Sequence, residues 1–183
     1  MKNQPDIVVV DDFLNNPDNW RELALQQDFK YHPQYHKGRR TEVRFWTEDW
    51  HETFETLLNR KITNANYDSN GIFQVCTAED PLVYHYDLQQ WAGALFLSPS
   101  APAETGTSFF RSRLTNARLG EVDDRSFSGG FYDRTQFELI DTIGNVYNRL
   151  VLWNAKLIHS ANAYNGTNLE TGRLFQLFFF DAE

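Results

Sequence analysis

The sequence contains a single cysteine, Cys76, among 183 residues. A disulfide needs two cysteines, so an intramolecular bridge is excluded and a reducing compartment is favoured. Long apolar runs are also missing. The run from Leu177 to Phe180 is far shorter than the roughly 20 residues that span a bilayer. The polar start and the short run Ile7–Val10 do not resemble a signal peptide. We therefore expect a cytoplasmic protein with no membrane partner.

Positive charge is scarce as well. Lys and Arg number 17 against 25 Asp and Glu, which gives a net charge of −8. Such a chain repels phosphate at long range, so no nucleic-acid partner is expected. One segment differs from this average, because residues 30–44 hold a single acid, Glu42, and the cations Lys30, Lys37, Arg39, Arg40 and Arg44. This segment is either a solvated loop or a loop that faces a substrate.

Aromatic residues are abundant, with 15 Phe, 8 Tyr and 5 Trp, and large rings favour pleated sheet surfaces. Helices are expected to start at Asn16-Pro17 and near Thr47. Another is expected over Asp133–Ile143. Strands are expected at Gly71–Thr77, Leu82–Asp87, Ala92–Leu97, Thr107–Arg113, Arg149–Trp153 and Arg173–Phe180. The length suits one domain, 1–183, with a helical part over about 1–70 and a β core over about 71–183. This order predicts a mainly β sandwich or barrel with flanking helices packed on one side.

Three separated elements carry candidate chemistry. His85 and Asp87 lie two apart on an expected strand, which places both side chains on one face. His159 follows the apolar strand Arg149–Trp153, and Arg173 opens another apolar strand. Alone, each has an ordinary explanation: a solvated pair, a hydrogen-bonded core histidine and an edge arginine. Together, two histidines and one carboxylate form the facial triad of non-haem Fe(II) oxygenases.

The order H-x-D, a distant His and an Arg fourteen residues later resembles the 2-oxoglutarate- and Fe(II)-dependent dioxygenases. The flanking segments Gln74-Val75, 94–97, 104–110 and 148–153 also resemble the prolyl-hydroxylase-like branch, particularly short stand-alone members from bacteria and phages. The resemblance covers about residues 71–180. It implies a double-stranded β-helix, or jelly roll, with the N-terminal helices packed on one sheet.

The resemblance further implies that His85, Asp87 and His159 are metal ligands and catalytic residues for Fe(II). Arg173 would bind the far carboxylate of the cosubstrate 2-oxoglutarate, and O2 would be the oxidant. The second cosubstrate contact stays open among Gln74, Tyr84 and Thr107, because the usual tyrosine is not in its place and Phe175 stands where some members carry a hydroxyl.

The implied reaction hydroxylates an unactivated C–H bond and releases succinate and CO2. A protein or peptide side chain is the first substrate candidate, followed by a free amino acid or other small metabolite. Arg39, Arg40 and Trp91 are candidate substrate-binding residues. Segment 121–130 is either a mobile lid or an exposed connection. A non-catalytic metal-binding jelly-roll module, or a zinc site, is the rival interpretation. The oligomeric state is left open.

Overall fold

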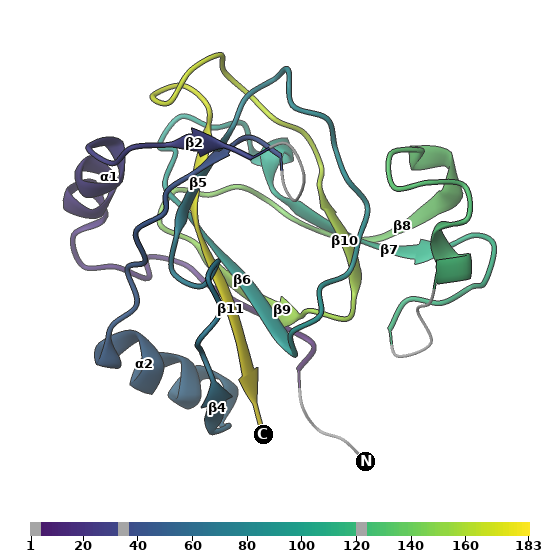
Figure 1. The fold of residues 1–183 in the computed structure, drawn as a ribbon, viewed down its shortest axis with the longest axis horizontal. Helices are drawn as coiled ribbons and strands as arrows, with labels where there is room; N and C mark the ends of the chain where they lie inside the picture. Colours follow the sequence, from purple (N-terminus) through teal and green to yellow (C-terminus); the bar gives the residue numbers. More distant parts are fainter. Residues whose placement is uncertain (1–4, 33–36, 120–123) are drawn as a thin grey trace.

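The computed structural model describes residues 5–32, 37–119 and 124–183. Two antiparallel sheets and two helices make up the fold (Figure 1). The larger sheet has the order β1-β9-β6-β11-β5-β3-β2, with β4 also paired to β11, and the smaller sheet has the order β10-β7-β8. The strands of the larger sheet are β1 Ile7–Val10, β2 Lys30–Tyr31, β3 Arg39–Arg40, β4 Ile62–Asn64, β5 Phe73–Cys76, β6 Trp91–Phe96, β9 Leu150–Asn154 and β11 Arg173–Ala182. Those of the smaller sheet are β7 Thr107–Ser112, β8 Phe137–Ile143 and β10 Ile158–Ala161.

The two helices, α1 Pro17–Leu25 and α2 Glu48–Leu58, begin where the sequence predicts. Pro17 occupies the first turn of α1, where its missing N–H costs nothing. Thr47 caps α2 by accepting a hydrogen bond from the Trp50 N–H at 3.4 Å, and Asn59 ends the helix in the left-handed region at φ 50°. None of the helices in the described residues has the length and apolar character needed to cross a membrane.

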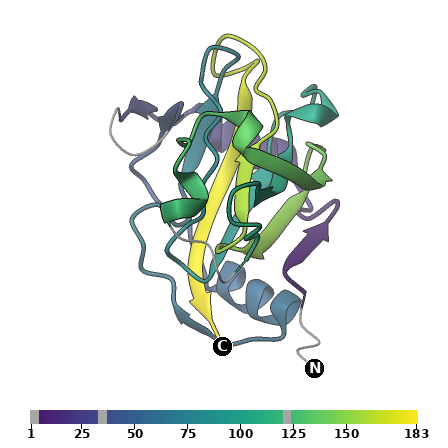
Figure 2. The same ribbon diagram turned by 90° about the vertical axis from the view of Figure 1, so that its right-hand side faces the viewer.

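Successive side chains of strand β11 point to opposite faces of the larger sheet. Leu174, Phe178 and Phe180 pack in the cluster that includes Trp50 and Phe54 of α2. The rings of Phe54 and Phe178 meet edge-on at 4.9 Å. The helices thus cover one face of this sheet, as expected, and Figure 2 shows α2 beside the long strand β11.

The opposite face of β11 presents Arg173, Phe175, Leu177 and Phe179. These residues point toward a cavity that is also lined by residues of the smaller sheet, including Thr107 and His159. The alternation of one strand therefore separates a helix-covered core from the cavity in which the candidate site lies.

The expected helix over Asp133–Ile143 is wrong. A single 3-10 turn, Arg134–Gln136, leads into β8, whose residues 138–141 alternate between half-buried and exposed. The pairing of β8 with β7 decides this, with Thr142 Oγ1 and Ser108 Oγ 3.0 Å apart across the strands. Local helical spacing gives way to pairing between strands and to the β preference of branched residues such as Ile140 and Thr142.

Two other expectations need correction. Leu82–Asp87 forms no strand, but one bridge joins His85 to His159. In segment 30–44, expected as a loop, the two-residue strands β2 and β3 pair with each other and β3 pairs with β5. The remaining expected strands match β5, β6, β7, β9 and β11 to within two residues at each end.

Candidate metal centre

His85 reaches the centre on an extended segment that joins the edge of β10. Its backbone N–H donates to the carbonyl oxygen of His159 at 3.0 Å, and the His159 N–H donates to that of His85 at 2.8 Å. Two residues later, the Asp87 N–H donates to the Ala155 carbonyl at 2.8 Å. Because residues two apart in an extended segment point the same way, His85 and Asp87 both face His159.

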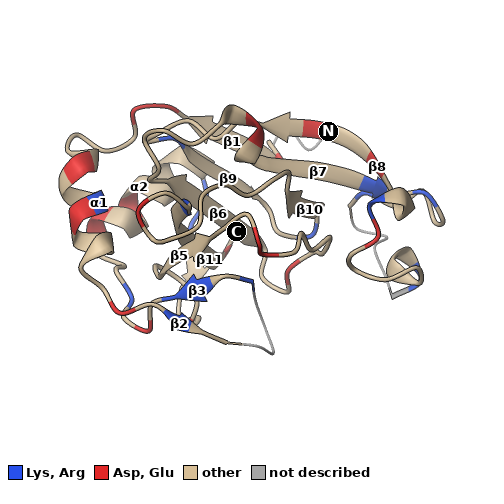
Figure 3. Ribbon diagram, turned by 90° about the horizontal axis from the view of Figure 1, so that it is seen from above, with Lys and Arg blue, Asp and Glu red and all other residues tan. Residues whose placement is uncertain are grey.

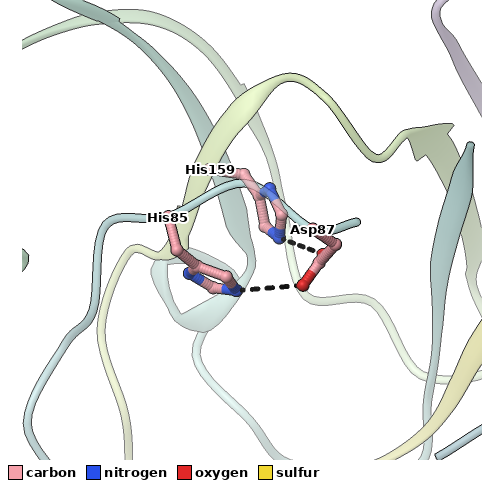
Figure 4. Close-up of side chains that lie close together, drawn as sticks. All are labelled: His85, Asp87 and His159. Carbon is pink, nitrogen blue, oxygen red and sulfur yellow. Dashed lines mark ion pairs between the residues drawn. The ribbon is translucent and has the colours of Figure 1, made fainter. Parts of the chain in front are cut away.

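The three side chains converge as Figure 4 shows. Nε2 of His159 lies 3.3 Å from Oδ2 of Asp87, and Nε2 of His85 lies 3.8 Å from Oδ1. One potential ligand atom from each residue lies within 4.8 Å of the others. The His159 side chain is 6% exposed and that of His85 is 41% exposed, so the cluster is closed on one side and open on the other.

Backbone contacts set the tautomer of both imidazoles. Nδ1 of His85 lies 3.0 Å from the Val83 carbonyl, and Nδ1 of His159 lies 2.9 Å from the Leu157 carbonyl. A carbonyl only accepts, so each Nδ1 carries the proton and donates it. In the neutral ring, the lone pair is then on Nε2, which faces the cluster. Both histidines therefore direct Nε2, the nitrogen that could bind a metal, toward the cluster.

Asp87 completes a donor set that fits a metal. Its buried Oδ2 has no hydrogen bond to a described group, despite its proximity to His159. Burial opposes ionisation of Asp87, but His159 and His85 hold its pKa below the usual value. Desolvation and the neighbouring His159 lower the pKa of His85. A carboxylate beside neutral imidazoles is the state that binds a divalent cation, and the two-nitrogen, one-oxygen set fits Fe(II).

The cluster opens into a cavity of about 490 Å³. Its walls include the cavity-facing side chains of β11, from Arg173 to Phe179. Trp153 of β9, and Thr107 and Ala161 of the smaller sheet, also line it. Trp153 also meets His159 edge-on, with ring centroids 5.1 Å apart. The cavity has the size of a small-molecule site, which usually measures about 300–1,000 Å³.

Arg173 lines this cavity as a cation without an ion-pair partner among the described residues. The residue is 3% exposed. Its Nε donates to the Thr105 carbonyl at 2.6 Å and its Nη2 to Thr107 Oγ1 at 3.2 Å, while the guanidinium lies over the Phe175 ring at 4.3 Å. No carboxylate of a described residue lies within 4.0 Å, and burial lowers its pKa. A buried, unneutralised guanidinium indicates an anionic ligand.

Of the three residues considered for a second cosubstrate contact, two line the cavity and one does not. Thr107 and Gln74 line the cavity, and the Thr107 hydroxyl already touches Arg173. Tyr84 does not line it. Its ring stacks on Phe137 at 4.9 Å and meets Phe110 at 5.0 Å, in a separate apolar cluster. One step along an extended segment from His85, Tyr84 points to the other side.

The candidate substrate residues separate in the same way. Arg40 lines the cavity, whereas its neighbour Arg39 is exposed and does not. Trp91 is 4% exposed and packs in the cluster under the helices. It is paired with Phe180 of β11, so the register places it on the helix-covered face, away from His85 and Arg173.

Sequence reasoning missed Tyr164. This residue lines the cavity, with its ring 5.9 Å from the Arg173 guanidinium, and burial raises its pKa strongly, so the phenol stays neutral. It lies outside regular structure, where no periodicity marks it. In segment 121–130, residues 121–123 are outside the described residues. The described part does not line the cavity, and Phe127 is buried beside Phe131.

Solved structures provide the comparison. HygX from Streptomyces hygroscopicus, with nickel, 2-oxoglutarate and hygromycin B bound, aligns over 97% of this chain and 83% of its own length, with a TM-score of 0.65 and 12% identity. A Pseudomonas putida prolyl-4-hydroxylase aligns over 97% of this chain and 92% of its own, with a TM-score of 0.52 and 11% identity. No protein-family model and no curated protein matches the sequence significantly.

These likenesses concern the course of the backbone, since so few residues are identical. They agree with the motif that the sequence carries and with the convergence of its two histidines and aspartate beside a buried arginine. The chain therefore shares the fold of HygX and of the prolyl-4-hydroxylase.

Proposed function

We propose that this protein is a 2-oxoglutarate-dependent Fe(II) dioxygenase that hydroxylates an unactivated C–H bond. One observation carries the proposal: the buried Arg173, without a carboxylate partner among the described residues, lines the same cavity as the His85, Asp87 and His159 cluster. A metal triad alone fits several metals and roles, but the added anion site fits a keto acid. The two sheets would form the double-stranded β-helix of the family.

Each residue then has a role. His85, Asp87 and His159 hold the metal through Nε2, a carboxylate oxygen and Nε2. Iron supplies the redox chemistry that couples the oxidation of 2-oxoglutarate by O2 to oxidation of the substrate. The balanced reaction converts R–H, O2 and 2-oxoglutarate into R–OH, succinate and CO2. Both imidazoles donate their Nδ1 hydrogens to backbone carbonyl oxygens, so Nε2 is the atom each offers to the metal.

Arg173 binds the far carboxylate of 2-oxoglutarate. Its Nε is occupied by the Thr105 carbonyl, which orients the plane of the guanidinium. Nη1 has no hydrogen-bond partner among the described residues, and Nη2 has only weak ones at 3.2 and 3.5 Å. Both are available for a bidentate pair with the carboxylate. Thr107 is our choice for the second contact, because its hydroxyl lies beside Nη2.

The substrate is proposed at the level of class. A protein or peptide side chain is supported by the shared fold of the Pseudomonas putida prolyl-4-hydroxylase. A small molecule is the second candidate, and it is supported by the hygromycin B bound to HygX and by the size of the cavity. The single cysteine, Cys76, is buried and free, which suits the reducing cytoplasm in which we place the enzyme.

The test is succinate release from 2-oxoglutarate by the chain freed of metal and reloaded with Fe(II) under air. We expect turnover that depends on Fe(II) and stops when Zn(II) replaces it. Isothermal titration of 2-oxoglutarate into the Mn(II)-loaded protein tests binding separately. Binding without succinate release under any substrate tried would identify a binding module. Absence of both would refute the proposal.

A further inference from the structure

A second arginine, which is partly buried, faces the cavity. Arg40 lies on β3, where it pairs with Gln74 of β5, which in turn pairs with Phe175 of β11. Residues opposite each other in neighbouring strands share a face, so the three side chains form one row toward the cavity. All three line it. Figure 3 shows β3 in the colour of Lys and Arg, next to β5 and β11.

Hydrogen bonds orient Arg40 without neutralising it. Its Nε donates to Gln74 Oε1 at 2.6 Å, and the Gln74 amide donates to the Lys37 carbonyl at 2.8 Å. Nη1 and Nη2 have no hydrogen-bond partner among the described residues, and no described carboxylate lies within 4.0 Å. Desolvation lowers the pKa of Arg40 to about 10, so it remains a cation at neutral pH.

The charge of the cavity is therefore unbalanced. Two guanidinium groups line it, from Arg40 and Arg173, against one carboxylate, from Asp87. The nearby Cys76 and Tyr164 have raised pKa values and are neutral. If the proposed function holds, a divalent metal and the doubly charged 2-oxoglutarate cancel each other. One positive charge then remains in a desolvated site, where an unpaired charge is costly.

We propose that Arg40 binds the carboxylate of the substrate, and that the substrate is a small organic acid with an apolar part. A singly charged anion removes the imbalance. Leu177 and Phe179 continue the cavity-facing side of β11 beyond Phe175 and offer an apolar surface. A cavity of about 490 Å³ that also takes the cosubstrate leaves room for a small molecule. This inference rests on the proposed function and selects the small-molecule alternative over a protein side chain.

The test uses the protein loaded with Mn(II) and saturated with 2-oxoglutarate, a state that binds without turning over. Hexanoate and 3-phenylpropionate are titrated calorimetrically, each against its primary amide. We expect both acids to bind and both amides to bind at least about tenfold more weakly, because they lack the charge-assisted pair. A peptide with one glutamate, blocked at both ends, is titrated alongside and should bind more weakly than either acid.

Variants locate the effect. Arg40→Gln should weaken binding of the acids about tenfold or more and leave the affinity for 2-oxoglutarate within about twofold. Arg40→Lys keeps the charge and should be intermediate. Arg39→Gln on the same strand is the matched control and should behave as the parent, since Arg39 does not line the cavity.

Any of four results would overturn the inference. The first is that the acids bind no better than their amides, and the second is that neither acid binds while 2-oxoglutarate does. The remaining two concern the Arg40→Gln variant and the peptide. The third is that Arg40→Gln weakens binding of 2-oxoglutarate as much as binding of the acids, which would make Arg40 a cosubstrate residue. The fourth is that the peptide with one glutamate binds more tightly than the free acids. Failure of 2-oxoglutarate itself to bind the parent protein would instead refute the proposed function, and the inference with it.

Discussion

The two faces of the larger sheet differ in how completely their polar side chains are hydrogen-bonded. On the helix-covered face, Gln176 of β11 is fully buried and uses its whole amide: Oε1 accepts from Trp20 Nε1 at 2.8 Å, and Nε2 donates to the carbonyls of Phe45 and Gly71. On the cavity face, Arg173 and Arg40 each have N–H donors without a hydrogen-bond partner in the part of the chain that the structure describes.

This difference separates structure from function. A buried polar group that is fully hydrogen-bonded supports the fold, because leaving it unpaired costs about 1–3 kcal/mol. A buried group whose partners are missing lowers stability unless a ligand supplies them. The same strand therefore holds, three residues apart, one side chain that stabilises the protein and one, Arg173, for which we propose a ligand-binding role.

The largest effect is expected at the metal cluster. Asp87→Ala should abolish metal-dependent succinate release, because it removes a ligand and leaves two imidazoles. The thermal stability of the metal-free variant should fall only modestly, because the two histidines stabilise the carboxylate but its buried Oδ2 has no hydrogen bond to a described group. Metal content by elemental analysis and thermal unfolding without metal check both points. Retained iron-dependent turnover would contradict the assignment of Asp87.

Arg173→Gln should follow. We expect an affinity for 2-oxoglutarate about 100-fold lower, or roughly 3 kcal/mol, from loss of a desolvated charge-assisted pair. Calorimetry with the Mn(II)-loaded protein measures it. Arg149→Gln is a suitable control, because Arg149 is paired with Asp11 away from the cavity and its loss should not change this affinity. An unchanged affinity in Arg173→Gln would remove the reason for choosing a keto acid.

Gln176→Met should show the reverse pattern. The new side chain has a similar shape but leaves Trp20 Nε1 and two carbonyls without their partner, which should lower the free energy of unfolding by about 1–3 kcal/mol. The affinity for 2-oxoglutarate should not change. Urea unfolding and calorimetry test the two halves. A variant as stable as the parent would contradict the view that the hydrogen bonds of Gln176 support the fold.

The smallest effect is expected from pH. The pKa values of His85 and Asp87 both lie below their usual values in the folded protein, so the unfolded chain binds more protons than the folded one. The stability of the metal-free protein should therefore fall as pH drops below the unfolded histidine value of 6.5, and again near that of aspartate. In His85→Gln the first decline should become shallower. Urea midpoints between pH 7 and 5 provide the measurement, and an identical slope in the variant would be evidence against this origin.

The sequence determined much of the site by itself. A period of two placed His85 and Asp87 on one side whether or not their segment formed a strand, because any extended backbone alternates its side chains. The two helix starts also followed from local chemistry, a proline in the first turn and a threonine cap. Such features depend on a few neighbouring residues, so they can be read without the rest of the chain.

Only the tertiary structure decided what depends on pairing between distant strands. The register of β6 with β11 placed Trp91 under the helices, and pairing with β7 made β8 a strand. The alignment of β3, β5 and β11 placed Arg40 at the cavity, where two guanidinium groups face one described carboxylate, that of Asp87. Pairing and charge balance are sums over residues far apart in the chain, which is why no local pattern in the sequence reveals them.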